Sequence, residues 1–289
     1  VALRARNNLC WFLGEDDPRG AMEASQGALE LSRRLGERHR LCILLQNLAS
    51  AALHAGEWDA ALAELEAALE EDFEALDRVS LLGNVHAIRA ARGEPTDALR
   101  AEVDALLGEN TEPVAIAERG WCDAWTAIAA DRLAAARAAC LEVVPVFAQG
   151  ADLAGVIAAR AALWGRDADG ARADLAGLEA RGSHRRVPAN ERRCIRAGIL
   201  ALDGRTDEAL ATYREVLRTW RDLGCSWDEA LAAIDMATLL DPSEPEVRAA
   251  AERGRDILAG LRARPFLERL DAVMEGVAPP PAAEPAGPA

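Results

Sequence analysis

The chain has 289 residues, of which 51% are hydrophobic and 4% aromatic, and it carries 33 basic against 48 acidic side chains. Every basic residue is an arginine, which excludes chemistry that needs a lysine amine, such as Schiff-base formation. The formal net charge of −15 disfavours nucleic-acid binding, because such a surface would repel phosphate backbones. The apolar residues are mostly Ala and Leu, which favours helices over sheets.

The six cysteines indicate a reducing, cytoplasmic environment. None forms a C-x-x-C pair, and all lie in apolar segments where a free thiol behaves as a small hydrophobic side chain. The sequence contains no apolar run of transmembrane length and no signal-peptide pattern, so we expect no membrane partner. Because Val1 opens the chain inside an expected helix, we also expect the sequence to be a piece of a longer protein.

The predicted elements are helices that come in pairs. The first pair turns near Gly14, where the long connection GEDDPRGA precedes the second helix. The second pair, residues 42–69, is the clearest, because its apolar residues recur every three or four positions, the period of one helical face. Gly56 interrupts that period, as a glycine that accepts positive φ does at a helix end.

The same pattern recurs along the chain. Predicted turn residues fall 35 to 42 residues apart, at Gly14, Gly56, Gly93, Asp131, Arg166 and Gly204. An alanine follows five positions after most of these turns, where two helices would cross closely: Ala61, Ala98, Ala136, Ala171 and Ala209. In the first pair the long connection delays this alanine to Ala21.

Prolines mark the breaks between later elements. Pro145 is predicted to end or kink its helix, and Pro188 lies in the longest break, RGSHRRVPANE. Residues 276–289 are rich in Pro and Ala and cannot bury a core, so we expect a folded region at 1–275 followed by a disordered tail. A seventh pair and a final capping helix are predicted at 227–240, 245–261 and 264–274.

The hairpin at 42–69 resembles the tetratricopeptide repeat, on its small residues Ala49, Gly56, Ala61 and Ala68 together with Leu45, Leu48 and Leu65. The resemblance implies an all-α fold: a right-handed α-solenoid of about seven helix-turn-helix repeats with a C-terminal capping helix. The family's aromatic positions are aliphatic or Ala here, and the spacing exceeds the standard unit of about 34 residues.

The stretches DLGCSWDEALAAIDMATLL and RARPFLERLDAVM extend this resemblance. They look like the helical-repeat region that ends large bacterial ATP-dependent signalling proteins, in which an ATPase, and often a nucleotide cyclase or a DNA-binding domain, precedes the repeats. No motif of those preceding domains occurs in this chain, so none of their activities is expected of it.

In the tetratricopeptide fold the first helix of each pair lines the concave side, so the resemblance implies which side chains face a groove. Four tryptophans and seven polar residues fall on that face: Trp11, Trp121, Trp125, Trp164, Arg4, Asn8, Gln46, Asn47, His54, Asn84 and Arg160. Rigid rings beside amide donors are typical of a peptide-binding groove. The alternative is that these tryptophans fill gaps between helices, as we expect of Trp58, Trp220 and Trp227.

Other patterns predict no specific chemistry. Some tetratricopeptide domains hold a ligand's carboxylate with asparagines at the positions of Asn47 and Asn84, but they also use lysines, which this chain lacks. The arginine cluster within 181–196 suits either an acidic partner or local ion pairs. No histidine has a second ligand at i+3 or i+4, and no catalytic or nucleotide-binding motif occurs, so we expect no metal, no cofactor and no enzymatic activity.

Two functions remain open. The first is an interaction module that binds a protein or peptide, including another domain of its parent protein. The second is a sensor that binds a small molecule in the concave channel and gates an attached ATPase or cyclase, since neutral aromatic and amide side chains around a central hole also suit a small ligand.

Overall fold

The computed structural model describes residues 2–146 and 151–276, and every regular element in these ranges is a helix. The all-α prediction is therefore confirmed. The helices are α1 (Ala2–Gly14), α2 (Pro18–Leu35), α3 (Arg38–Ala55), α4 (Trp58–Leu69), α5 (Ala75–Arg92), α6 (Asp97–Leu107), α7 (Pro113–Ala129), α8 (Leu133–Val143), α9 (Ala151–Trp164), α10 (Ala168–Ala180), α11 (Arg186–Leu202), α12 (Thr206–Leu223), α13 (Ser226–Leu239), α14 (Pro245–Leu261) and α15 (Arg264–Met274).

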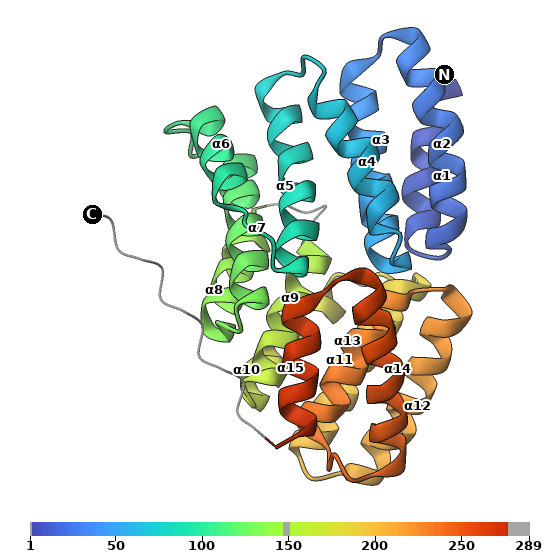
Figure 1. Cartoon of the computed structure of the whole chain (residues 1–289), viewed down its shortest axis with the longest axis vertical. Helices are drawn as coiled ribbons and strands as arrows, with labels where there is room; N and C mark the ends of the chain where they lie inside the picture. The colour runs from blue at the N-terminus through green and yellow to red at the C-terminus, as the bar shows by residue number, and fades with distance from the viewer. Residues whose placement is uncertain (1, 147–150, 277–289) are drawn as a thin grey trace.

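Helices that follow each other in the chain pack side by side, joined by short turns (Figure 1). The odd-numbered helices also pack against one another in sequence, from α1 through α3, α5, α7, α9, α11 and α13 to α15. They form an inner row, and the even-numbered helices cover its outside. This arrangement explains why α9 and α13 are buried almost all round, because they contact neighbours on most sides.

Most of the predicted turn residues adopt the left-handed conformation. The φ angle is 79° at Gly56, 70° at Gly93 and 76° at Gly204, and it is also positive at Asp131 and Arg166. The prediction is wrong for Gly14, which is the last residue of α1. The longer connection turns through Asp16 and Asp17 instead, whose backbone N–H groups both donate to the Leu13 carbonyl, and the Asp17 side chain then caps α2.

The predicted crossing alanines are buried completely at Ala21, Ala61, Ala136, Ala171 and Ala209. Ala98 is the exception, because it lies exposed on α6. The turn after Gly93 includes Glu-Pro-Thr, so α6 begins only at Asp97 and its contact face is shifted along the sequence. Val103, which is fully buried, is one of the residues that α6 packs against its neighbours instead.

The inner row bends back on itself, so that α13 packs against α3 and α9, and α15 packs against α5 (Figure 1). Hydrogen bonds close this contact. Ser226 Oγ donates to the Ala55 carbonyl at 2.8 Å, and Arg92 Nε donates to the Leu261 carbonyl at 3.1 Å. The indole of Trp227 lies 4.9 Å from that of Trp58, measured between ring centroids. The sequence pattern gave no indication of this closure.

The C-terminal elements match their predicted positions within one or two residues, as α13, α14 and α15. Helix α8 ends at Val143, two residues before Pro145, as its proline predicts. The expected tail lies outside the described residues from 277 onward. Among the described helices, none is both long and apolar enough to cross a membrane.

Candidate functional site

The inner row surrounds three adjoining cavities. The large cavity lies among α1, α3, α5 and α7 and offers about 220 Å³ to the centres of water-sized molecules. The middle cavity, between α1, α3, α9 and α11, offers about 130 Å³, and the small cavity offers about 30 Å³. Leu153 borders all three, so they are neighbouring parts of one interior space.

Nine of the eleven residues predicted to face a groove border these cavities: Trp11, Gln46, Asn47, His54, Asn84, Trp121, Trp125, Arg160 and Trp164. The other two, Arg4 and Asn8, are exposed on α1 and border none of the three. The Trp11 side chain is half-exposed, whereas Trp125 and Trp164 are buried. Whether any of these residues binds a ligand stays a prediction.

The tryptophans expected only to pack divide into two groups. Trp58 and Trp220 are fully buried between helices, in line with that expectation. Trp227 is also buried, but it borders the small cavity together with Trp125 and Trp164.

The amides of the large cavity are held by neighbours. Asn47 Nδ2 donates to Asn7 Oδ1 at 3.2 Å, and Asn84 Nδ2 donates to the Ser80 carbonyl at 2.8 Å. Ser80 Oγ donates to Glu118 at 2.5 Å, and burial raises the pKa of the Glu118 carboxyl. The lack of a carboxylate clamp at Asn47 and Asn84 stays a prediction.

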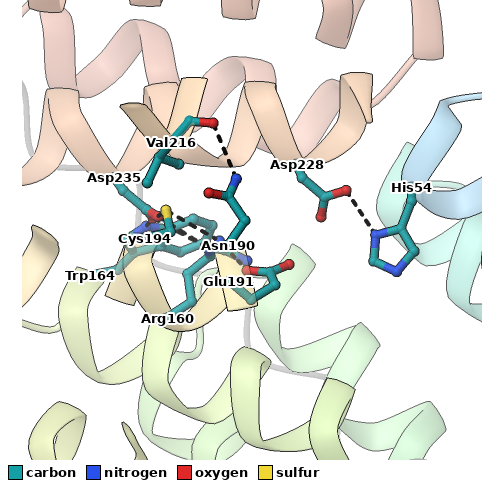
Figure 2. Close-up of polar contacts among 9 residues, drawn as sticks. All are labelled: His54, Arg160, Trp164, Asn190, Glu191, Cys194, Val216, Asp228 and Asp235. Atoms are coloured by element: carbon teal, nitrogen blue, oxygen red, sulfur yellow. Dashed lines mark hydrogen bonds and ion pairs between the residues drawn. The ribbon is translucent and has the colours of Figure 1, made fainter. Parts of the chain in front are cut away.

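A buried polar cluster lies beside the small cavity, where α3, α9, α11 and α13 meet (Figure 2). His54 Nδ1 lies 2.8 Å from Asp228 Oδ2. Arg160 Nε lies 3.3 Å from each carboxylate oxygen of Asp235, and its Nη2 lies 3.4 Å from Glu191 Oε2. All five side chains are buried, so their interactions act in a medium of low polarity.

Asp235 anchors this cluster by accepting several hydrogen bonds. Trp164 Nε1 donates to it at 2.6 Å, and the Cys194 thiol donates to it at 3.3 Å, in addition to the Arg160 guanidinium. A buried charge is tolerated only when it is paired, and the charges of Arg160 and Asp235 compensate each other. The carboxyl of Glu191 is left as the one with the weakest partner in the cluster, since its contact with Arg160 is the longest of these ion-pair distances.

The electrostatics of the cluster favour one retained proton on Glu191. Burial raises the pKa of its carboxyl to about 8, against the opposing charge of Arg160, and the Asp228 carboxylate adds to the rise. For His54, burial acts to lower the pKa, but the ion pair with Asp228 outweighs it and the net direction is upward. At neutral pH the cluster therefore holds His54 paired with Asp228, Arg160 paired with Asp235, and a neutral Glu191.

Ligand atoms of His54, Glu191 and Asp228 lie within 4.8 Å of one another. One imidazole and two carboxylates are a donor set that transition metals accept. His54 Nδ1 and Asp228 Oδ2 already pair with each other at 2.8 Å, so a metal ion bound by both would have to displace that pair. The absence of a metal site stays a prediction.

Sequence reasoning missed the acids of this cluster. Glu191 lies within the arginine-rich segment, and its neighbours Arg185 and Arg196 pair with Asp16 and Glu179 on the surface. Asp228 and Asp235 are seven residues apart, two turns along one face of a helix that is rich in Ala. That pair of acids on an Ala-rich face was a signal that could have been used.

Aromatic rings surround the small cavity. Trp227 lies between Trp125 and Phe266, with centroid separations of 6.5 and 4.9 Å. The Nε1 atom of Trp125 is buried and has no hydrogen-bond partner among the described residues. An indole N–H in such a place is a donor that a bound acceptor would satisfy.

Comparison with known protein families and with curated proteins finds no match to this chain.

Proposed function

We propose that this chain is a regulatory binding module: a tetratricopeptide-like α-solenoid of about seven helix pairs that takes a small molecule in its interior. The observation that carries the proposal is the set of adjoining cavities along the inner row, bordered by aromatic, amide and acidic side chains. A concave, largely apolar space with a few polar groups is the usual form of a small-molecule site.

The closure of the inner row favours a small molecule over an extended peptide. A peptide groove needs an open trough along several repeats, whereas here α13 packs against α3 and α15 packs against α5, so the inner row returns on itself. The space that remains is divided into volumes of about 220, 130 and 30 Å³. One water needs roughly 10–15 Å³ on this measure, so the larger two suit molecules of several heavy atoms each.

The setting of this function follows from the resemblance to the repeat region of bacterial ATP-dependent signalling proteins. In that setting the module is a cytoplasmic sensor without enzymatic activity, whose ligand changes the behaviour of an attached ATPase or cyclase. The reaction itself belongs to the attached domain.

A thermal-shift screen tests this function. A ligand at 100 times its dissociation constant stabilises the folded state by about 2.7 kcal/mol, which raises the melting temperature by several degrees. Trp121→Ala removes an aromatic wall of the large cavity and should abolish the shift for ligands that bind there. Leu35→Ala, at an exposed residue that borders none of the three cavities, should preserve it. A metabolite library that yields no shift contradicts the proposal.

A second function has its own supporting observation. Leu9, Trp11 and Phe12 form an exposed apolar patch on α1, with the two rings 5.1 Å apart. Such a patch is typical of a protein interface, and it fits a partner protein or another domain of the parent. The double variant Leu9→Ser and Phe12→Ser should lose partner binding in a pull-down with the parent protein's other domains, and unchanged binding rules the patch out.

A further inference from the structure

The small cavity has a composition unlike the other two. Its border combines the buried acids Glu191 and Asp228 with the rings of Trp125, Trp227 and Phe266. The buried bases His54 and Arg160 lie on the same border. Acids beside aromatic faces are the combination by which proteins recognise organic cations, because both attract positive charge while the rings also pack against methylene groups.

We infer that the small cavity binds the protonated amine of a small-molecule ligand, with the carboxylates of Glu191 and Asp228 accepting its N–H groups. The inference rests on the proposed function and specifies the ligand's chemical class. The rest of the ligand lies in the middle cavity, which shares His54 and Glu191 with the small one.

The size of the small cavity fits this assignment. Its 30 Å³ admits the centres of roughly two water-sized groups, enough for an ammonium and one methylene. The polar atoms of His54, Glu191 and Asp228 lie within 4.8 Å of one another, so the two carboxylates converge on one small volume.

A second observation points to a bound molecule at the same place. Trp125 is 3% exposed and borders the small cavity, and its buried indole N–H has no partner among the residues that the structure describes. An acceptor close to the amine, such as a hydroxyl group, would satisfy that donor. The ligand class is therefore an amine with a neighbouring hydrogen-bond acceptor.

The charges of the cluster allow a cation to enter. Arg160 is matched mainly by Asp235, and His54 is matched by Asp228. Glu191 is the carboxyl with the weakest partner, because its 3.4 Å contact with Arg160 is the longest of these ion pairs. A cationic amine beside Glu191 favours its ionised form, so the carboxyl gives up its proton as the amine arrives. The site then exchanges a proton for the ligand's charge and avoids burying an unpaired ion.

The test compares amines with neutral molecules of the same shape. The probes are 4-aminobutanol against 1,4-butanediol, and 2-phenylethylamine against 2-phenylethanol, measured with the full chain by calorimetry at pH 7. We expect each amine to bind at least roughly tenfold more tightly than its alcohol, since a charge-assisted hydrogen bond contributes more than a neutral one. Calorimetry in two buffers of different ionisation enthalpy should report about one proton released per amine bound.

Matched variants test which carboxylate binds the amine. Glu191→Gln imitates the neutral carboxyl of the free protein, so it should fold, and it should lose the preference for amines and the proton release. Glu252→Gln changes an exposed acid that borders none of the three cavities, and should leave both unchanged. Asp228→Asn, checked for folding by circular dichroism, should also weaken amine binding by roughly tenfold.

The outcomes separate this inference from the proposed function. If alcohols bind as tightly as amines, or Glu191→Gln binds amines as well as the original chain does, the amine inference is wrong while the binding function stands. Zn²⁺ that binds in place of amines and depends on His54 also overturns the inference. If neither these probes nor the metabolite library bind, both proposals fail.

Discussion

At the scale of single residues, burial sets the chemistry of the Glu191 carboxyl. The side chain is 3% exposed, and its pKa is raised to about 8 from an ordinary value of 4.5. The folded chain therefore keeps a proton on Glu191 that the unfolded chain releases in mildly acidic solution. Its stabilising effect is complete below pH 4.5 and is lost as the pH rises through about 8.

A pH series on Glu191→Gln tests this linkage. Between pH 4.5 and about 8, the Glu191 contribution makes the free energy of unfolding fall by up to about 1.4 kcal/mol per pH unit. Glutamine carries no titrating proton, so urea unfolding of the variant should show a correspondingly shallower decline over this range. Parallel curves for the two proteins would show that Glu191 ionises in the folded chain as it does in water.

The residues of the cavities were only partly predictable. The aromatic and amide residues were predicted from their positions in the helix pairs. Nine of the eleven predicted residues border the cavities, whereas Arg4 and Asn8 on α1 do not. The acids Glu191 and Asp228 were not predicted. Acids are common on the helices of so acidic a chain, and whether one is buried depends on which helices meet. Only three-dimensional packing brings residue 54 to residue 228.

At the scale of elements, the left-handed turns fix where each helix stops. Gly56 and Gly204 both have positive φ, but their surroundings differ. A Cβ at Gly56 would meet Ser226 Oγ at 2.3 Å, whereas a Cβ at Gly204 would meet nothing within 4 Å. The periodic spacing of the turns predicted both positions. The close approach of α13 at one of them was not predictable from that spacing.

This difference gives a matched pair of substitutions. Gly204→Ala introduces backbone strain alone and should lower the free energy of unfolding by about 1 kcal/mol. Gly56→Ala adds the collision with Ser226, which donates to the Ala55 carbonyl, and should cost about 2 kcal/mol or more. Equal losses in urea denaturation would contradict the contact between the α3–α4 turn and α13.

At the scale of the whole molecule, α13 and α15 contact helices that are far from them in the sequence, α3 and α5. In an open repeat protein each unit touches only the adjacent ones, so units can unfold separately. Here Trp227 on α13 packs against Trp58 on α4, Trp125 on α7 and Phe266 on α15. This aromatic group links distant parts of the chain.

Removal of the Trp227 ring tests whether this aromatic group couples the unfolding of distant helices. Trp227→Ala should lower the free energy of unfolding by about 3–5 kcal/mol, because it leaves a void where α4, α7, α13 and α15 meet. Hydrogen exchange should accelerate in α4 and α7 as well as in α13. The control Trp11→Ala, at a side chain that is 48% exposed, should cost much less and leave exchange in α13 unchanged. Exchange confined to α13 would show that the units unfold independently.

The fold was more predictable than its closure. Local signals such as turn residues, prolines and apolar periodicity placed the C-terminal helices within one or two residues. Curvature of the row depends on small rotations between successive pairs, which accumulate over many units and are not set by any single residue. The return of α13 to α3 therefore had no local signature.

The position of α13 late in the chain has a consequence for synthesis. The ribosome delivers α3 long before α13, so the apolar surface around Leu53 and Trp58 stays uncovered while more than half of the chain is still being made. The nascent protein therefore passes through a stage at which chaperones have a target that the finished molecule hides.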